Sequence, residues 1–265
     1  MTEHFDFLVI GGGSGGMAGA RRAAEYGART AIVEGDRLGG TCVNVGCVPK
    51  KMMWNAAHFA DTLAIADDYG FALPDTTFDW ASFKDARDAY ILRLNGIYQR
   101  NLESSKVSLY TGWAQFDSTS TVRVGDQYLS ADHILIATGG RPMMPKVPGA
   151  DLAITSDGFF DLDTQPQRPL IIGAGYIATE LAGMLNALGS NVTMALRKDI
   201  LLRGFDITLR ESVMDEMISA GINILTGVQI IGIVREENGL LAVQRQDGEQ
   251  ISGFDCVIYA IGRDP

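Results

Sequence analysis

Cysteine and histidine are scarce in this sequence, and long apolar runs are absent. The 265 residues include three cysteines and three histidines. Three cysteines are too few for the disulfide framework of a small secreted protein, so a close pair would be catalytic or metal-binding rather than structural. No segment reaches the roughly 18 to 20 consecutive apolar residues that a membrane span requires. The N-terminus, MTEHFDFLVI, has charges on both sides of Phe5 and lacks the pattern of a signal peptide. We therefore expect a cytoplasmic protein.

Positive charge is also in deficit. Lys and Arg total 22 against 32 Asp and Glu, which gives a formal net charge of -10. Nucleic acids and anionic membranes require a basic face, so the composition argues against both as partners. With 46% hydrophobic residues, the chain is long enough for two domains that each bury a core of their own.

Strand and helix patterns alternate along the chain. Residues 5–10 have the pattern of a buried strand, a glycine-rich turn and a helical pattern follow, and residues 28–33 form a second apolar strand. The same order recurs about 160 residues later, beginning at residues 170–172. Strands that alternate with helices predict an α/β fold with doubly wound parallel sheets.

Three further patterns complete the layout. Long helical patterns begin near residue 46 and cover residues 80–102. Short strands with Gly and Asp turns over residues 107–129 predict a small antiparallel insertion. The prolines within residues 141–148 indicate a linker. The sequence therefore predicts two Rossmann-like dinucleotide-binding domains, residues 1–141 and 142–265.

The first glycine-rich turn has the spacing of a dinucleotide-binding loop. Gly11, Gly13 and Gly16 form the pattern G-x-G-x-x-G between a strand and a helix. These glycines permit a tight turn, close approach to a pyrophosphate and close helix packing, while the helix N-terminus presents free N–H groups. Glu34, at the end of the next strand, can accept from both ribose hydroxyls. A merely flexible glycine-rich loop is the alternative, but the surrounding pattern favours an adenine dinucleotide with free ribose hydroxyls.

A second loop of this kind opens the second cycle, with Gly173, Gly175 and an alanine, Ala178, at the third position. No carboxylate ends the following strand; Arg197 and Arg203 lie there instead. Arginines at this offset suit the additional 2′-phosphate of NADP, which they can hold bidentately. Ordinary surface charge is the alternative, and in so acidic a chain we favour NADPH.

Two of the cysteines lie in the run GGTCVNVGCVPKK, residues 39–51. Cys42 and Cys47 are five residues apart at the start of a predicted helix, whose N-terminus would stabilise a thiolate. No second cysteine pair exists, and His58 lies eleven residues beyond Cys47, so we expect no zinc site and no other metal. Cys256, in the apolar run 254–260, is predicted to be a buried core thiol.

The run GGTCVNVGCVPKK resembles the redox motif of the flavoprotein disulfide reductases, and its ending VPKK resembles the branch that acts on glutathione and trypanothione. The resemblance continues through RRAAEYGAR, DAYILRLNGIYQRNL, HILIATGGRP, TSDGFF and AIGR, and so covers nearly the whole chain. It implies FAD and NADPH as cofactors, a Cys42–Cys47 redox disulfide, and glutathione disulfide as the substrate. Dihydrolipoyl dehydrogenase, an NAD-using relative, ends the motif differently.

The resemblance also implies a role for each matching position. Cys42 would attack the substrate disulfide, and Cys47 would lie against the flavin. Lys50 would pair with Glu180 beside the reactive flavin nitrogen, and Tyr176 would cover the flavin until nicotinamide displaces it. Besides the glycines of the first loop, the FAD positions would be Ser14, Gly15, Glu34, Thr41, Cys42, Lys50, Ala114, Thr138, Gly139 and Glu180. The NADPH positions would be Gly173, Ala174, Gly175, Ile177, Ala178, Arg197, Arg203 and Gly262.

Substrate choice is expected to depend on six positions that the resemblance places around the pocket. Arg21 would hold a glycine carboxylate of glutathione, and Tyr98 would pack between its two halves. Trypanothione reductases have an acid near Ala18 and an aromatic residue at the position of Arg21, so both departures favour the anionic glutathione disulfide. A solvated helix charge is the alternative for Arg21. The six positions are Ser14, Ala18, Arg21, Ile97, Tyr98 and Asn101.

The family has further segments after its NADPH domain, which complete the FAD domain and form an interface domain with an acid/base His–Glu pair. We therefore expect an N-terminal portion that is weakly active or inactive alone, and a homodimer for the full-length protein. None of the three histidines is positioned to replace the missing pair. Two alternatives stay open: a related reductase of trypanothione, dihydrolipoamide or mercuric ion, and a non-catalytic nucleotide-binding fragment. One departure is Trp113, beside Ala114, where many relatives have a smaller or imidazole side chain.

Overall fold

The computed structural model describes residues 2–74 and 76–265, which divide into two compact units. The first unit contains the chain up to Lys50, together with Asp85–Gly140 and Pro265. The second contains Lys51–Lys84 and Arg141–Asp264. The α/β fold class predicted from the sequence is confirmed. The assignment of one cofactor to each predicted domain stays a prediction.

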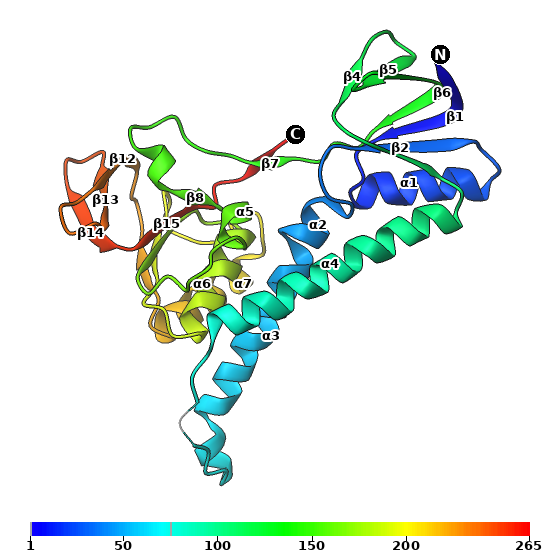
Figure 1. The fold of residues 1–265 in the computed structure, drawn as a ribbon. Coiled ribbons are helices and arrows are strands. Elements are labelled where there is room, and N and C mark those ends of the chain that lie inside the picture. The colour runs from blue at the N-terminus through cyan, green and yellow to red at the C-terminus, as the bar shows by residue number, and fades with distance from the viewer. Residues whose placement is uncertain (1, 75) are drawn as a thin grey trace. The chain divides into compact units, whose positions relative to one another are not determined.

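A six-stranded sheet of order β3-β2-β1-β6-β5-β4 organises the first unit (Figure 1). Strands β3, β2, β1 and β6 run parallel, whereas β5 and β4 pair antiparallel to their neighbours. The expected antiparallel insertion is therefore only partly right, because β3 extends the parallel part of the sheet beside β2. The strands are β1 (Glu3–Ile10), β2 (Thr30–Glu34), β3 (Ser108–Thr111), β4 (Ala114–Phe116), β5 (Thr121–Val124) and β6 (Gln127–Ile136).

Apolar side chains cover both faces of this sheet, as parallel strands require. On one face Phe5, Leu8 and Val33 join Val122 and Leu129 in a buried cluster. The opposite face packs on helix α1 (Ser14–Glu25) and the end of helix α4 (Trp80–Ser104), through a second cluster. The predicted helices near residues 14, 46 and 80 are confirmed as α1, α3 (Cys47–Ala64) and α4, with the shorter α2 (Gly40–Asn44) and η1 (Ala66–Tyr69) between them.

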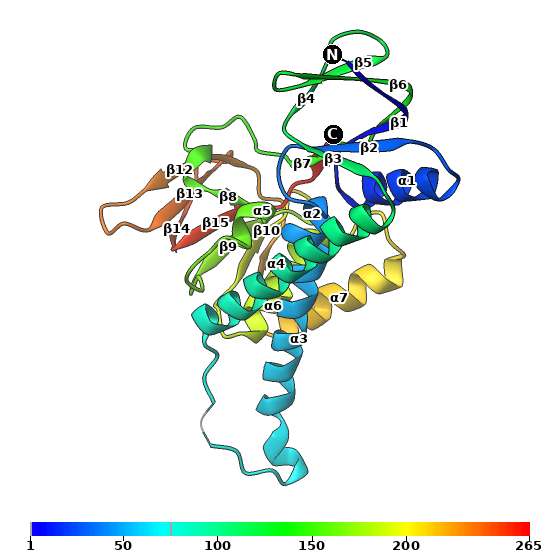
Figure 2. The same ribbon diagram turned by 45° about the vertical axis from the view of Figure 1, so that its right-hand side comes forward.

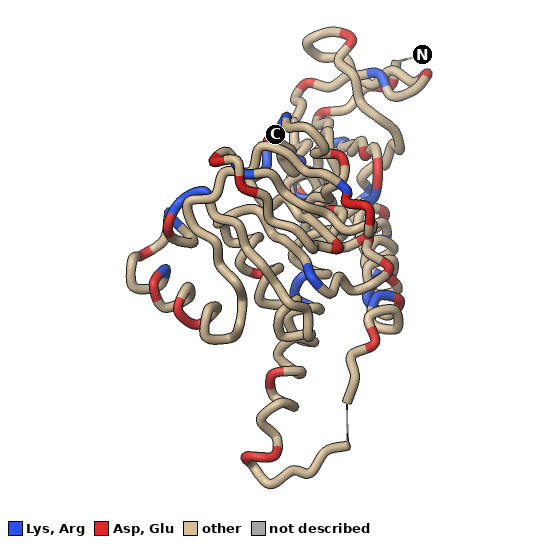
Figure 3. Tube along the Cα trace, turned by 90° about the vertical axis from the view of Figure 1, so that its left-hand side faces the viewer, with Lys and Arg blue, Asp and Glu red and all other residues tan. Residues whose placement is uncertain are grey.

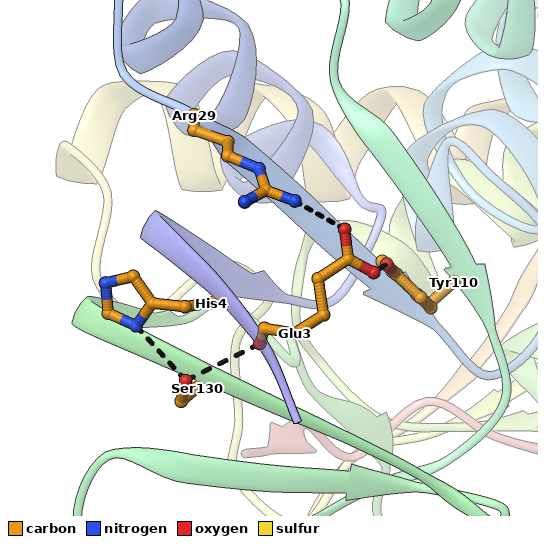
Figure 4. Close-up of polar contacts among 5 residues, drawn as sticks. All are labelled: Glu3, His4, Arg29, Tyr110 and Ser130. Carbon is orange, nitrogen blue, oxygen red and sulfur yellow. Dashed lines mark hydrogen bonds and ion pairs between the residues drawn. The ribbon is translucent and has the colours of Figure 1, made fainter. Parts of the chain in front are cut away.

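A polar network ties three strands together at the edge where β1 begins (Figure 4). The carboxylate of Glu3 accepts a hydrogen bond from Arg29 Nη2 at 2.6 Å and another from the hydroxyl of Tyr110 at 2.6 Å. Burial, the bond to Glu3 and the carboxylate charge together raise the pKa of Tyr110 to about 12. His4 Nδ1 and Ser130 Oγ, 3.1 Å apart, link β1 to β6 at the same edge. Glu3 and His4 lie at the opposite end of β1 from the glycine loop.

A five-stranded parallel sheet of order β11-β10-β9-β15-β8 organises the second unit (Figure 2). Its strands share a core with the antiparallel sheet β12-β13-β14, in which Leu170, Ile172 and Val257 pack with Val243 and Phe254. The strands are β8 (Ile154–Thr155), β9 (Pro169–Ile172), β10 (Thr193–Ala195), β11 (Asn223–Leu225), β12 (Ile230–Arg235), β13 (Leu241–Arg245), β14 (Gln250–Phe254) and β15 (Cys256–Tyr259). The helices are η2 (Ala150–Leu152), α5 (Ser156–Phe159), α6 (Tyr176–Ala187) and α7 (Ile207–Ser219).

The predicted linker over residues 141–148 begins with a short strand instead. β7 (Arg141–Pro142) pairs antiparallel with β16 (Arg263–Asp264) in a two-stranded sheet. Proline is tolerated there because an edge strand leaves one side without ladder partners.

Charged residues are spread along the trace rather than gathered in one segment (Figure 3). In the part of the chain that the structure describes, no helix is both long and apolar enough to cross a membrane. The described residues also contain no group of three or more His, Cys, Asp or Glu side chains that could hold a metal ion.

Candidate active site

The first glycine loop joins β1 to α1 by contacts that only glycine permits. Gly11 has φ +107°, and a Cβ there would lie 2.3 Å from the carbonyl oxygen of Ala137. A Cβ on Gly16 would lie 1.8 Å from the carbonyl oxygen of Gly11. Helix α1 begins at Ser14, and no side chain of the described residues caps it. The free N–H groups of this helix suit a pyrophosphate. They lie at the end of β1, where β2 and β6 flank β1 on opposite sides, and this is the point of the sheet at which dinucleotides bind.

Glu34 is held beside this loop by backbone N–H groups. Its Oε2 accepts from Gly12 N at 2.5 Å, and its Oε1 accepts from Asp36 N at 2.8 Å. A carboxylate has about four acceptor positions, so both oxygens keep capacity for ribose hydroxyls. Thr138 and Gly139 come shortly after β6. Ala137, the residue between β6 and Thr138, donates its backbone N–H to the carbonyl of Ile10 at 2.8 Å. These two positions therefore lie at the same edge of the sheet as the loop.

The loop that carries the redox cysteines runs alongside the first glycine loop. Gly39 N donates to the carbonyl of Gly12 at 2.8 Å, and Gly13 and Gly39 form a parallel bridge. The buried amide of Asn44 fixes the next turn: its Nδ2 donates to the carbonyl of Gly40 at 2.9 Å. Asn95, on α4, donates to Asn44 Oδ1 at 3.0 Å.

Asn44 and Asn95 were missed by the sequence interpretation. The position of Asn44 between the two cysteines was the only available signal for either residue. A polar side chain that is buried requires partners, and the Asn44 amide finds them in backbone carbonyls of its own loop and in the side chain of Asn95 on α4.

Cys42 and Cys47 are brought together from two helices. Cys42 lies in α2 and is partly buried, whereas Cys47 begins α3 and is exposed; both are free thiols. Burial raises the pKa of Cys42, and the hydrogen bond to Cys47 and the charge of Cys47 raise it further. Hydrogen bonds from the Ser14 hydroxyl and from the backbone N–H of Cys47 act in the opposite direction. The pKa of Cys42 is raised overall, because burial and Cys47 outweigh these two hydrogen bonds.

The second glycine loop repeats the geometry of the first. A Cβ on Gly173 would lie 2.2 Å from the carbonyl oxygen of Ala260, on the strand-end that flanks β9. Gly175 is the N-cap of α6, and within residues 2–74 and 76–265 no side chain caps this helix either. Ala178, at the third position of the motif, is fully buried, so a small residue is needed there for the helix to pack on β9.

A cavity of about 650 Å³ opens at this second loop and includes basic but no acidic side chains among its lining residues. Arg197, Lys198 and Arg203 line it together with Gly173, Ala174 and Gly175. Among the described residues, none of these three cations has a hydrogen-bond or ion-pair partner. A site of this kind can accommodate an anionic dinucleotide with an additional phosphate. Ile177, Glu180 and Gly262 are not in the lining, although Gly262 follows Ile261, which is.

The predicted substrate positions lie on α1 and α4, which pack together through Met17, Ala20 and Leu102. Arg21 is partly buried, and its Nε donates to Ser105 Oγ at 3.1 Å, which leaves its terminal nitrogens for an anion. Tyr98 packs against the same apolar cluster. Whether Ala18, Ile97 and Asn101 contact a substrate stays a prediction.

Three residues with predicted catalytic roles, Lys50, Glu180 and Tyr176, are divided between the two units. Lys50 belongs to the first unit and Glu180 to the second, so their pairing stays a prediction. Tyr176, the first residue of α6, is 58% exposed. An exposed phenol next to the second loop suits the proposed covering role, which also stays a prediction.

Comparison with known proteins confirms the family resemblance. The model of the family described as pyridine nucleotide-disulphide oxidoreductase matches residues 5–265. A glutathione reductase of Yarrowia lipolytica is 49% identical over an alignment that covers 99% of the chain and 59% of that protein. A glutathione reductase of Schizosaccharomyces pombe is 47% identical, with coverage of 100% and 59%. The chain thus spans about three-fifths of the length of these curated relatives. It belongs to the pyridine nucleotide-disulphide oxidoreductase family.

Proposed function

We propose that this chain takes part in the reduction of glutathione disulfide by NADPH, with FAD and the Cys42–Cys47 pair as electron carriers. The names of its relatives and its family support this proposal. The observation that carries it is the contact of Cys42 with both Cys47 and Ser14, beside the first glycine loop. A thiol pair at a dinucleotide loop is the arrangement that electron transfer from a flavin to a disulfide requires.

The first loop is the proposed FAD site. The uncapped N-terminus of α1 would bind the pyrophosphate, and Glu34 would accept from the ribose hydroxyls. Thr41, Ala114, Thr138 and Gly139 would complete the binding surface. When bound, FAD supplies the chemistry that takes a hydride from NADPH and passes two electrons to a disulfide.

The cavity at the second loop is the proposed NADPH site. Its fit rests on Arg197 and Arg203, two cations that have no hydrogen-bond or ion-pair partner among the residues described and that line the cavity together with Gly175, the N-cap of α6. The helix would bind the pyrophosphate, and the arginines would hold the 2′-phosphate. Tyr176 would move aside to admit the nicotinamide, and Lys50 with Glu180 would stabilise the reduced flavin.

The two thiols of the reduced chain would carry out the substrate half of the reaction. Cys42 loses its proton and attacks one sulfur of glutathione disulfide; that S–S bond breaks, and one glutathione leaves as a thiolate that takes up a proton. The Ser14 hydroxyl and the Cys47 N–H stabilise the Cys42 thiolate against the effect of burial. Cys47 then attacks the Cys42 sulfur, releases the second glutathione and forms the Cys42–Cys47 disulfide. Two electrons and two protons thereby pass from the pair to the substrate.

Substrate selection would follow from the charge of α1. The terminal nitrogens of Arg21 would bind a carboxylate of glutathione, and Tyr98 would line the pocket. A cationic disulfide such as that of trypanothione would find no carboxylate partner at Ala18 or Arg21. A cytoplasmic location and a homodimer of the full-length protein are further parts of this proposal.

The test is NADPH oxidation by the chain, with FAD supplied, in the presence and absence of glutathione disulfide. We expect at most weak substrate-dependent oxidation, which disappears in Cys42→Ser and persists in the matched control Cys256→Ser. A Cys47→Ser variant should retain glutathione on Cys42 as a mixed disulfide, which intact-mass measurement detects without any turnover. If the reduced variant formed no mixed disulfide, the assignment of Cys42 as the attacking thiol would be wrong.

A further inference from the structure

An exposed indole lies beside the end of β2. The side chain of Trp113 is 78% exposed. Its ring atoms Cδ2, Cε2 and Cε3 lie 2.8, 3.0 and 3.1 Å from the position that a Cβ on Gly35 would occupy. All three belong to the six-membered ring, so one face of the indole rests on Gly35. The opposite face accounts for the exposure, and an aromatic surface of this size normally gains stability when it is covered.

The position of the indole is fixed with respect to Glu34. Gly112 N donates to the carbonyl oxygen of Glu34 at 2.8 Å, which places the following residue, Trp113, at the end of β2. The Glu34 carboxylate is itself held by Gly12 N. The open face of the indole and the Glu34 carboxylate, which is proposed to bind a ribose, therefore both lie at the C-terminal end of β2. The base is bonded directly to that ribose, so it would also lie near the end of β2, where the indole is.

We propose that Trp113 is the stacking surface for the adenine ring of the dinucleotide bound at the first glycine loop. This inference rests on the proposed function, in which that loop binds FAD. Purine rings stack on aromatic side chains through their π-faces, and such contacts account for a large share of nucleotide affinity. Trp113 then acts on affinity for FAD, which contains adenine, and not on affinity for FMN, which does not.

The experiment measures equilibrium binding of FAD, FMN and NADPH to the chain and to three variants. Trp113→Ala should weaken FAD binding about ten-fold, which corresponds to ~1.4 kcal/mol, and should leave NADPH binding unchanged. Trp113→Phe keeps an aromatic face and should lose less. The matched control is Phe116→Ala, since Phe116 is a 52% exposed aromatic residue at the far end of β4. This control should bind FAD as the unaltered chain does.

Oxidation by N-bromosuccinimide gives a second readout that needs no variant. Bound FAD should protect Trp113 from oxidation, as seen by peptide mass spectrometry, whereas FMN should not. Trp54, which is 43% exposed and lies in the second unit, serves as the internal reference.

The outcomes separate this inference from the proposed function. If the unaltered chain binds FAD but Trp113→Ala binds it equally well, the adenine role is wrong and the FAD site stands. If Trp113→Ala weakens NADPH binding to the same extent, the indole has only a structural role and the inference fails. Equal protection of Trp113 by FMN would have the same meaning. If the unaltered chain binds no FAD at all, the proposed function fails and the inference fails with it.

Discussion

The three cysteines of the reduced chain should react with an alkylating reagent in an order set by their surroundings. Cys47 is exposed, and Cys42 is partly buried with a raised pKa. Burial, with a smaller effect of the Asp255 charge, raises the pKa of Cys256 from its ordinary value of 9.0 to about 12. We therefore expect Cys47 to react first, Cys42 next and Cys256 last.

The size of the effect at Cys256 follows from its ionisation. At pH 8 an ordinary thiol is about one-tenth ionised, whereas a thiol of pKa about 12 is ionised to about one part in ten thousand. A more basic thiolate is also a better nucleophile, and with a Brønsted coefficient of about 0.4–0.5 this recovers roughly 15- to 30-fold. Cys256 should therefore react ~30- to 60-fold more slowly than an ordinary thiol, before any steric effect of burial.

The assay is a time course with iodoacetamide at pH 8, followed by peptide mass spectrometry of all three sites. In urea the three rates should converge, because the differences arise from the fold. Between pH 9 and pH 11 the rate at Cys256 should continue to rise about ten-fold per pH unit. Native-state alkylation of Cys256 as fast as that of Cys47, or a rate at Cys256 that levels off near pH 9, would refute the reasoning.

Three further predictions concern single side chains. Gly16→Ala places a Cβ 1.8 Å from a backbone oxygen, so it should lower the melting temperature and abolish FAD binding. In the control Gly15→Ala the new Cβ has no atom within 4 Å, and this variant should fold normally. Equal melting temperatures of the two variants would contradict this. Arg203→Ala should weaken NADPH binding ~10- to 100-fold and leave NADH binding unchanged, because a charge-assisted hydrogen bond contributes about 1.5–3 kcal/mol; calorimetry with both nucleotides decides. Tyr110→Phe should cost about 1 kcal/mol of unfolding free energy at pH 8. Because folding raises the Tyr110 pKa from 10.0 to about 12, this contribution is present below pH 10 and is lost as pH rises toward 12, so urea midpoints of the two proteins should converge at high pH.

Local sequence patterns were sufficient to predict the two glycine loops, the cysteine pair and the basic residues near the second loop. Each of these features depends on residues a few positions apart, whose geometry follows from a strand, a turn and a helix in succession. The alternation of strands and helices in turn predicts the parallel sheets, because a crossover helix joins parallel neighbours.

The features that escaped prediction depend on which segments meet in space. Asn95 is 51 residues from its partner Asn44, and no local pattern selects one amide on α4 over another. The pattern of β3 is the same for parallel and antiparallel pairing, and its direction is set by where the chain returns after α4. The direction of the Cys42 pKa shift is set by burial, whereas a helix terminus in the sequence indicates only a dipole.

The contact between the first glycine loop and the cysteine loop limits how this protein can diverge. A Cβ on Gly40 would lie 2.8 Å from the Cα of Gly13, and Gly39 N donates to the carbonyl of Gly12. Every atom in this junction belongs to the backbone. In a packed core, a side chain that is too large can be compensated by a smaller neighbouring side chain. A side chain placed here would instead meet backbone atoms, which no substitution removes. Second-site suppressors of a substitution at Gly40 should therefore not arise at Gly13, and reversion should be the principal route to recovery.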